Sequence, residues 1–319
     1  MLARFRLYRF GVLADIWKVF LQISLYEQDR NFLRFLWNSE GELIHYRHCR
    51  VVFGVSSSPF LLGSTIQYHL EKKLEEKQGL GKYPECIVQK LRNSFYVDNC
   101  LASVQTKSEL DRFIDAATKI VAERKFELRG WEHSNPSDPI ASPTNVLGMI
   151  WDRHCDTLSL NIPDLRELMQ EIITKRNILA ASHKVFDPLG ITVPVLLLPK
   201  LWLQSLWKSQ IGWDQEVDIK TRQDFLKWLK ELEYLKHVQV PRWLHCDSGF
   251  QNISLHFFCD ASKLAYSAVV FLRVDIGSTV HIQLVQSKTR ISPCGKRKQQ
   301  LPDWNFLELL YLLVFLQLS

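Results

Sequence analysis

The chain has 319 residues, 46% of them hydrophobic and 23% charged, so it can bury the cores of two or three globular domains and is not a disordered protein. Its net charge of +6 suits a polyanionic partner without requiring one. Seven cysteines, an odd number without a Cys-x-x-Cys pair, argue against a disulfide framework or a zinc ribbon. They predict a reducing compartment, the cytoplasm or the nucleus, rather than secretion.

The first predicted element is a strand over residues 5–16, which carries the single acid Asp15 among apolar residues. No secretory signal peptide is expected before it. Phe20 follows five positions after the acid, and its apolar neighbours are equally typical of a core phenylalanine. Residues 38–41 have hairpin-turn composition between two apolar runs, which predicts a β-hairpin.

A switch from strand to helix is predicted at residues 51–60, where Phe53 and Gly54 precede three serines and Pro59. Serine caps helices, proline is favoured in their first turn, and glycine permits close backbone approach. An ordinary capped helix start explains the same pattern. The helix predicted over residues 60–78 ends in a charged face, which is most simply solvated.

A second lone acid, Asp98, lies in the apolar stretch 94–101, where two strands and a tight turn at Asp98 and Asn99 are predicted. An amphipathic helix is predicted over residues 108–125. A buried carboxylate without a partner loses its hydration, so Asp15 and Asp98 are expected to meet. Because magnesium prefers oxygen ligands, the pair predicts a site for two such ions. Taken singly, either acid is an ordinary strand-end or turn aspartate.

A segment rich in helix and strand breakers, residues 134–143, predicts a domain boundary. Strands near residues 146–160 and helices over residues 165–184 and 196–209 are predicted after it. Four tryptophans recur here beside lysines, and these are Trp202, Trp207, Trp213 and Trp228. Base stacking with phosphate binding remains open, although core packing is the commoner outcome for this pattern.

The last predicted unit begins with a strand that ends in Asp260 and continues through a hairpin and a third strand over residues 285–290. A helix that contains Glu308 is predicted to follow. The apolar run 306–318 is too short to span a bilayer, so no membrane partner is expected.

Several of these segments match known motifs. Tyr96-Val97-Asp98-Asn99 resembles the Tyr-x-Asp-Asp box of reverse transcriptases, and Ala14-Asp15-Ile16 followed by residues 20–23 resembles their first catalytic motif. Further blocks follow in the same order, at residues 50–60, 175–179, 186–190 and 258–262. Together they resemble the pol polyprotein of BEL/Pao retrotransposons.

The resemblance implies an α+β fold with a reverse-transcriptase-like palm, a helical thumb and connection, and a truncated ribonuclease H-like sheet. The predicted domains are a palm fragment without its fingers over residues 1–132, a thumb and connection in the Pao retrotransposon peptidase family region over residues 133–250, and the N-terminal part of a ribonuclease H-like domain over residues 251–319.

The resemblance also implies RNA-templated DNA synthesis by a DNA/RNA polymerase, with two Mg²⁺ ions, a primer–template and deoxynucleotides. Asp15 and Asp98 would hold the metal ions, with Asn99 as a weakened third ligand. Phe20 would be the sugar gate. The implied nucleotide site comprises Phe20, Phe53, Gly54, Ser58, Pro59 and Tyr96, and the implied ribonuclease H remnant comprises Asp260 and Glu308.

One departure bears on activity, because Asn99 stands where the second acid of the motif is expected. An amide keeps an oxygen for coordination but loses a charge worth several kcal/mol gross at about 4 Å from a divalent ion. Impaired synthesis is therefore expected, and no ribonuclease H activity, because its remaining acids would lie downstream. Fingers and other polyprotein segments are expected to be missing at both ends. The oligomeric state is not predicted.

Two alternatives remain open. The first is a non-catalytic remnant that binds nucleic acid through basic surfaces such as residues 296–298. The second is an aspartic peptidase that uses Asp247-Ser248-Gly249, the one Asp-Ser-Gly triplet in the chain. The flanking residues of this triplet are more typical of a surface turn.

Overall fold

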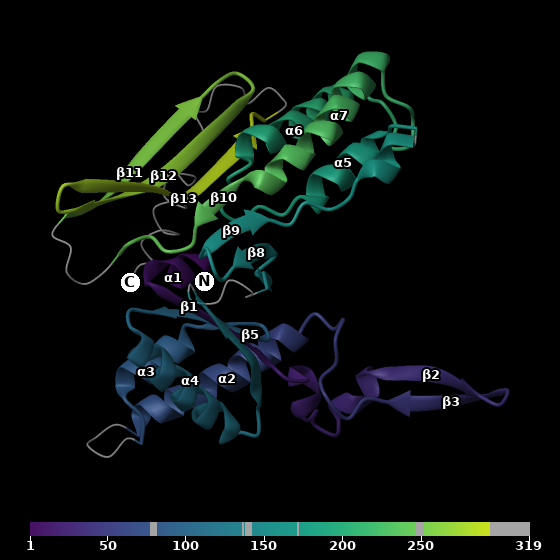
Figure 1. The fold of residues 1–319 in the computed structure, drawn as a ribbon. Helices are drawn as coiled ribbons and strands as arrows, with labels where there is room; N and C mark the ends of the chain where they lie inside the picture. Colours follow the sequence, from purple (N-terminus) through teal and green to yellow (C-terminus); the bar gives the residue numbers. More distant parts are fainter. Residues whose placement is uncertain (77–81, 136, 138–141, 171, 247–251, 294–319) are drawn as a thin grey trace. The chain divides into compact units, whose positions relative to one another are not determined.

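The computed structural model describes residues 1–293 except 77–81, 136, 138–141, 171 and 247–251. The chain divides into two compact units (Figure 1). The first unit comprises Met1, Ala3–Phe5 and Arg9–His133, and the second comprises Leu2, Arg6–Tyr8 and Ser134–Ser319. The peptidase triplet, the basic residues 296–298 and Glu308 lie outside the described residues.

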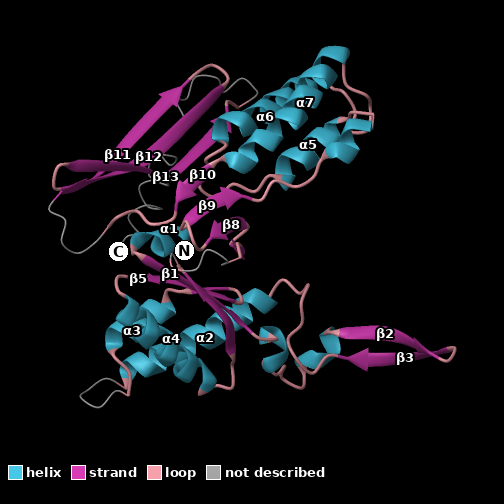
Figure 2. Ribbon diagram, viewed as in Figure 1, coloured by secondary structure: helices cyan, strands magenta, loops and turns pink. Residues whose placement is uncertain are grey.

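The first unit is built on an antiparallel sheet with the strand order β4-β5-β1-β6. Its strands are β1 (Phe10–Ile16), β4 (Phe95–Tyr96), β5 (Asn99–Val104) and β6 (Leu128–His133). Three helices cover one face (Figure 2), and these are α2 (Ser58–Glu75), α3 (Glu85–Arg92) and α4 (Lys107–Ala122). The short helices η1 (Val19–Gln22) and η2 (Asp29–Phe32) follow β1.

The alternation of side chains along β1 places Asp15 on the face opposite to the helices. Val12, Ala14 and Ile16 are buried in the cluster that contains the helix residues, whereas Asp15 points to the opposite face and is exposed. The helix α4 starts where predicted, because the Thr106 hydroxyl accepts a hydrogen bond from the backbone N–H of Glu109 at 3.2 Å. Leu13 and its partner Leu101 lie on the same face as Asp15 and are buried, so this face is exposed only at the end that carries Asp15.

The predicted hairpin is confirmed as β2 (Arg34–Ser39) paired with β3 (Glu42–Arg47). Glu40 and Gly41 both have positive φ, of 53° and 90°, as a tight two-residue hairpin turn requires. Figure 1 shows this hairpin projecting away from the helices of the same unit.

Two local predictions were wrong. The strand predicted over residues 5–16 is present as β1 from Phe10 to Ile16, but its predicted start is wrong, because residues 2–7 form the helix α1 (Leu2–Leu7). The turn predicted at Asp98 and Asn99 is instead formed by Val97 and Asp98, because Tyr96 pairs with Asn99 and so brings Asn99 into the sheet. Asn99 is thereby a strand residue directly opposite Asp15.

The second unit contains two sheets and a helical region. One sheet has the order β10-β9-β8-β7, with β7 (Thr144–Val146), β8 (Met149–Asp152), β9 (Thr157–Leu160) and β10 (Gln239–Pro241). The other is the antiparallel meander β11 (Asn252–Ala261), β12 (Ala265–Ile276) and β13 (Thr279–Ile291). The helices are η3 (Arg166–Gln170), α5 (Lys175–Lys184), α6 (Val193–Lys208), α7 (Ile219–Glu231) and η4 (Leu232–His237).

The helix predicted over residues 165–184 is interrupted, because Thr174 and Asn177 form a capping box that starts α5. The four tryptophans of this region divide into two pairs. Trp202 and Trp228 pack edge to face at 6.3 Å, and Trp228 is buried. Trp207 and Trp213 remain 60% and 41% exposed. Core packing thus explains the first pair only. Within the described residues, no helix combines the length and apolarity needed to cross a bilayer.

Candidate metal and nucleic-acid site

The acids Asp15 and Asp98 lie at one end of the paired strands β1 and β5. The register places Asp15 opposite Asn99, and the backbone N–H of Ile16 donates a hydrogen bond to the Asp98 carbonyl at 2.8 Å. Residues 83 positions apart are thus fixed at the same edge of the sheet, as their partnership predicts. We call Asp15, Asp98 and Asn99 the acidic edge.

Asn99 bridges the two acids. Its side-chain nitrogen donates to Asp15 Oδ1 and to Asp98 Oδ1, each at 3.1 Å. The two carboxylate oxygens are therefore no farther apart than twice that distance. A single cation could contact both oxygens, and in this structure the neutral amide makes that contact.

The electrostatics of the acidic edge favour a positive partner. Partial burial raises the pKa of Asp15, and the nearby charges of Asp98 and Glu132 raise it further. The guanidinium of Arg129, which is opposite Asp15 on β6, acts against this shift. The ionised form of Asp15 is thus disfavoured first by partial burial and then by the neighbouring carboxylates, and a cation beside Asp15 would favour it.

The turn that carries Asp98 has an unusual backbone. Val97 has a φ of 54°, a conformation that β-branched residues rarely adopt. Such conformations persist only where the surrounding structure imposes them. Here the Tyr96–Asn99 pair and the hydrogen bond from Ile16 to Asp98 hold the turn on both sides. The strained turn brings Asp98 to the end of β1.

The donor set of the acidic edge fits one magnesium ion better than two. Magnesium commonly uses one or two protein carboxylates and completes its shell with water and phosphate oxygens. Asp15 and Asp98 meet this requirement. Within the described residues, no group of three or more His, Cys, Asp or Glu side chains is placed to hold a metal ion. Asn99 could add an oxygen only by turning its amide away from its present hydrogen bonds.

The residues predicted to contact a nucleotide differ in exposure. Phe20 is buried in the core, and its ring meets that of Phe53 edge to face at 4.7 Å. Phe53 is 69% exposed and Tyr96 is 57% exposed. Gly54, with a φ of 81°, has open space on its Cβ side. The structure therefore joins Phe20 to Phe53, while the role of Phe20 as a sugar gate stays a prediction.

Ser58 and Pro59 stand in the first turn of α2, as the sequence predicts. Ser58 is buried, and its hydroxyl donates a hydrogen bond to the Val52 carbonyl at 2.7 Å. The hydroxyl thereby ties the preceding loop to the helix. A contact between Ser58 and a nucleotide stays a prediction.

Two cations beside the acidic edge were missed from the sequence. The Lys18 ammonium lies 4.5 Å and the Arg129 guanidinium 5.2 Å from the ring centroid of Trp17. Trp17 and Lys18 directly follow β1, and Arg129 pairs across the sheet with Asp15. The pairing of β1 with β6 brings these groups together, and no spacing of residues in the sequence predicts that pairing.

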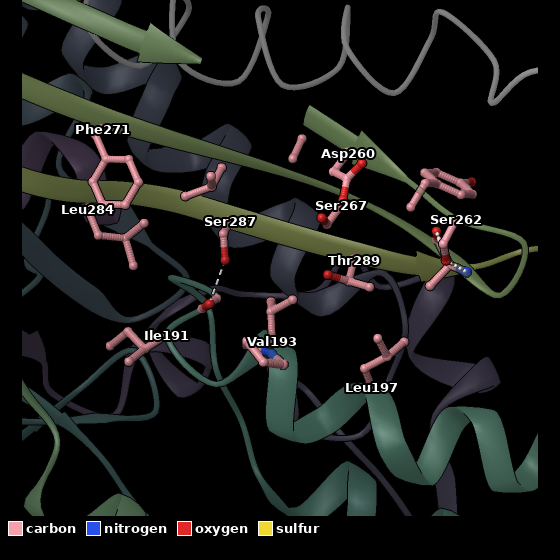
Figure 3. A pocket seen from close by; sticks show the side chains of 16 residues that line it. Ile191, Val193, Leu197, Asp260, Ser262, Ser267, Phe271, Leu284, Ser287 and Thr289 are labelled. Atoms are coloured by element: carbon pink, nitrogen blue, oxygen red, sulfur yellow. Dashed lines mark hydrogen bonds between the residues drawn. The ribbon is translucent and has the colours of Figure 1, made fainter. Parts of the chain in front are cut away.

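Asp260 lies away from the acidic edge, in a cavity of about 490 Å³ in the second unit. Figure 3 shows Asp260, Ser267 and Thr289 on the sheet side of this cavity and Val193 and Leu197 on the helix side. Asp260 is exposed near the end of β11 and is opposite Ser267 on β12. Its predicted partner Glu308 lies outside the described residues.

The motif at residues 186–190 forms a turn that packs on the same sheet. The Asp187 carboxylate accepts hydrogen bonds from the backbone N–H groups of Gly190 and Thr192, at 2.8 and 2.6 Å. Gly190 has a φ of 80°, and a Cβ there would lie 2.0 Å from the Ser287 carbonyl oxygen. The Ser287 hydroxyl donates to the Gly190 carbonyl at 2.6 Å. Only glycine fits this approach, and the acid of the motif is engaged in the turn.

Comparisons with known proteins agree with parts of this picture. Residues 174–317 match the family described as Pao retrotransposon-like RNaseH-like domain. The match begins before the predicted boundary at residue 251 and includes α5, α6 and α7 as well as the β11–β13 sheet. It assigns no part of the first unit. No curated protein matches the chain.

Two solved structures are similar in fold. One is the foamy viral protease-reverse transcriptase in complex with RNA/DNA hybrid, with a TM-score of 0.55 and 14% identity over 98% of this chain and 38% of that chain. The other is the foamy viral protease-reverse transcriptase dRH in complex with ds DNA, with a TM-score of 0.58 and 15% identity over 100% of this chain and 50% of that chain. The present chain thus spans half or less of these proteins. The mixed helix and sheet fold resembles these structures.

Proposed function

We propose that the first unit is a polymerase palm of the reverse-transcriptase type that binds a primer–template and retains a weakened magnesium site at the acidic edge. The observation that carries the proposal is the meeting of Asp15 and Asp98 on both sides of the Asn99 amide. The fold similarity to viral reverse transcriptases supports it. By this proposal the chain descends from an RNA-directed DNA polymerase.

The residues at and beside the acidic edge would have different roles. Asp15 and Asp98 would hold the metal, which supplies charge neutralisation at the reacting phosphate and activation of the primer hydroxyl. Arg129 and Lys18 lie beside this edge and would contact the phosphates of the primer–template. The exposed end of the sheet at Asp15 would receive the nucleic acid.

Asn99 explains why the site would be weak. Two carboxylates attract a divalent cation less strongly than three, and the cation must also displace two hydrogen bonds from the amide. An aspartate at this position would restore the charge. The substitution Asn99→Asp is therefore the sharpest test of the proposal.

The test compares the unaltered chain, Asn99→Asp, and the double variant Asn99→Asp with Asp15→Asn. Binding of Mn²⁺, a paramagnetic substitute for Mg²⁺, is followed by electron paramagnetic resonance. We expect Asn99→Asp to bind roughly tenfold or more tightly than the unaltered chain, because one unit charge is added within contact distance of the ion. The double variant should lose this gain.

Primer extension on an RNA template with a DNA primer and deoxynucleotides is the second readout. We expect Mg²⁺-dependent extension by Asn99→Asp and none by the double variant. Unchanged Mn²⁺ affinity in Asn99→Asp, together with no extension, would contradict the proposal.

A second candidate function is favoured by one observation, the neutral amide that already bridges the two acids. The chain could serve as a nucleic-acid-binding module that needs no metal. In that case binding to a primer–template would weaken with salt and would be unaffected by a chelator, and Asn99→Asp would gain no extension activity.

A further inference from the structure

The hairpin formed by β2 and β3 exposes large side chains on both of its faces. Phe35, Trp37 and Tyr46 are 40%, 59% and 46% exposed, and every residue of β3 is exposed. Two-stranded hairpins are marginally stable in water, and large exposed apolar side chains are costly unless they serve a contact. The hairpin therefore has the character of a binding element.

One face of this hairpin carries a stack of aromatic rings. Phe35 is opposite Tyr46 in the register, and their rings lie 5.6 Å apart at an angle of 20°. His48 stacks on Phe35 at 4.8 Å and 29°. Trp37 lies two residues further along the same face and pairs with Ile44. We call Phe35, Tyr46 and His48 the hairpin stack.

The rings of the hairpin stack are nearly parallel, at 20° and 29°. Nearly parallel packing also occurs in the interior, where Phe225 and Trp228 meet at 22°, but the hairpin stack is at the surface. Nearly parallel rings at the surface have the same arrangement as stacked nucleic-acid bases, so a base can stack on them. Since every base has a flat π face, such a stack can accept bases without regard to sequence.

Three arginines near the open end of the hairpin are suited to phosphate groups, and the register places Arg34 and Arg47 on the face opposite to the hairpin stack. Arg34 and Arg47 both donate to the side-chain oxygen of Asn31, at 2.9 and 3.3 Å, and Arg50 donates to the Ser24 hydroxyl. In the part of the chain that the structure describes, none of these three guanidinium groups pairs with a carboxylate. Neutral partners orient the arginines and leave their charge uncompensated. Arginines held in this way are suited to phosphate oxygens.

From the stacked rings and the uncompensated arginines we propose that the β2–β3 hairpin binds single-stranded nucleic acid. Bases stack on the hairpin stack and on Trp37, and Arg34, Arg47 and Arg50 contact the phosphates. A protein partner would need acidic groups opposite three arginines, whereas a nucleic acid supplies both features along its whole length. This inference rests on the nucleic-acid binding in the proposed function and is independent of the metal at the acidic edge.

The test measures binding of a fluorescein-labelled oligothymidine to the full chain by fluorescence anisotropy, in the presence of a chelator. Phe35→Leu and Tyr46→Leu remove a π face but keep an apolar side chain. We expect each substitution to weaken binding roughly five- to 100-fold, which corresponds to the loss of stacking with one base. Tyr46→Phe keeps the ring and should bind like the unaltered chain.

The arginines are tested through salt. The double variant Arg34→Gln with Arg47→Gln should show a weaker salt dependence. The slope of log affinity against log salt concentration should become less negative by about 1.4, as expected for the loss of two phosphate contacts on a single strand. A blunt duplex should show little change in affinity with any hairpin variant.

The matched control is Leu36→Ala combined with Leu43→Ala, which removes two exposed apolar side chains from the opposite face of the same hairpin. Equal losses in this control and in Tyr46→Leu would overturn the proposal. Sedimentation that shows self-association lost in Tyr46→Leu would also overturn it, because a second copy would then occupy the face. The chelator should leave oligothymidine binding unchanged, so a failure of this test can be distinguished from a failure of the metal test.

Discussion

Asp156 in the second unit and Asp15 in the first are both carboxylates beside a strand end, yet their surroundings are opposite. Asp156 receives two hydrogen bonds from Arg242, at 2.7 and 2.8 Å, and others from Trp151 and Ser134. The Arg242 side chain is fully buried. Asp15 instead faces Asp98, and an amide is the group that joins them. A carboxylate that has its own cation holds the fold together, whereas carboxylates joined by a neutral group leave room for a cation from outside.

Arg6 strengthens the contrast. This second buried guanidinium of the second unit donates to the carbonyls of Leu284 at 2.8 Å and of Arg242 and Pro241 at 3.2 Å. Burial, with a smaller contribution from the neighbouring charge of Arg242, lowers the pKa of Arg6 to about 10. Two buried arginines share this region with Asp156, so this carboxylate is needed to balance them.

The largest effect is expected at Asp156. Asp156→Asn keeps the size of the side chain but leaves the charge of Arg242 buried without its carboxylate. We expect a loss of about 3–5 kcal/mol in the free energy of unfolding, measured by urea denaturation followed by tryptophan fluorescence. Asp214→Asn, which breaks the exposed pair between Arg176 and Asp214, should produce no measurable change. A loss at Asp156 no greater than in this control would remove the contrast between the two regions.

A smaller effect is expected at Asn99, and its sign should depend on magnesium. Without Mg²⁺, Asn99→Asp should lower the free energy of unfolding by about 1 kcal/mol, because two hydrogen bonds are replaced by repulsion among carboxylates. Saturating Mg²⁺ should restore the loss through binding to the folded state. Thermal unfolding with and without Mg²⁺ measures both. The control is Asn145→Asp, at the exposed residue of β7, which should show no dependence on Mg²⁺.

The smallest effect is expected at Asp15, and it should be a gain. Because its pKa is raised in the folded protein, ionisation of Asp15 as the pH rises costs stability. At neutral pH without metal, Asp15→Asn should therefore be more stable, by less than about 1 kcal/mol after screening by solvent. The difference should vanish as the pH falls below the ordinary range of carboxyl groups. Lower stability of Asp15→Asn at neutral pH would show that the acidic edge is already compensated.

The sequence predicts much of the first unit because its elements depend on local signals. The turn at residues 38–41 and the amphipathic helix α4 follow from residue type and spacing. The meeting of Asp15 with Asp98, 83 positions away, was expected instead from the cost of burying a lone carboxylate. The turn at Val97 does not, since valine disfavours positive φ and Asp98 and Asn99 are the better turn formers. The strand register determines which residues form this turn, and register is a property of the whole sheet.

The packing of the second unit is harder to predict from the sequence, because the contacts that stabilise it join residues far apart in the chain. Asp156 and Arg242 are 86 positions apart, and no periodicity connects them. The four tryptophans are similar by spacing, and both pairs pack edge to face, yet only Trp207 and Trp213 remain exposed. The glycine at residue 190 could be noticed within its motif, but its close approach to Ser287 could not.

The hydrogen bond from Arg6 to the carbonyl of Leu284 has a consequence for synthesis of the chain. The two residues are 278 positions apart, so Arg6 leaves the ribosome long before its partner exists. The second unit therefore cannot finish folding during translation until almost the whole chain has emerged. Residues 134–319 expressed alone would lack these hydrogen bonds, and a piece that begins at the family match would lack Asp156 as well.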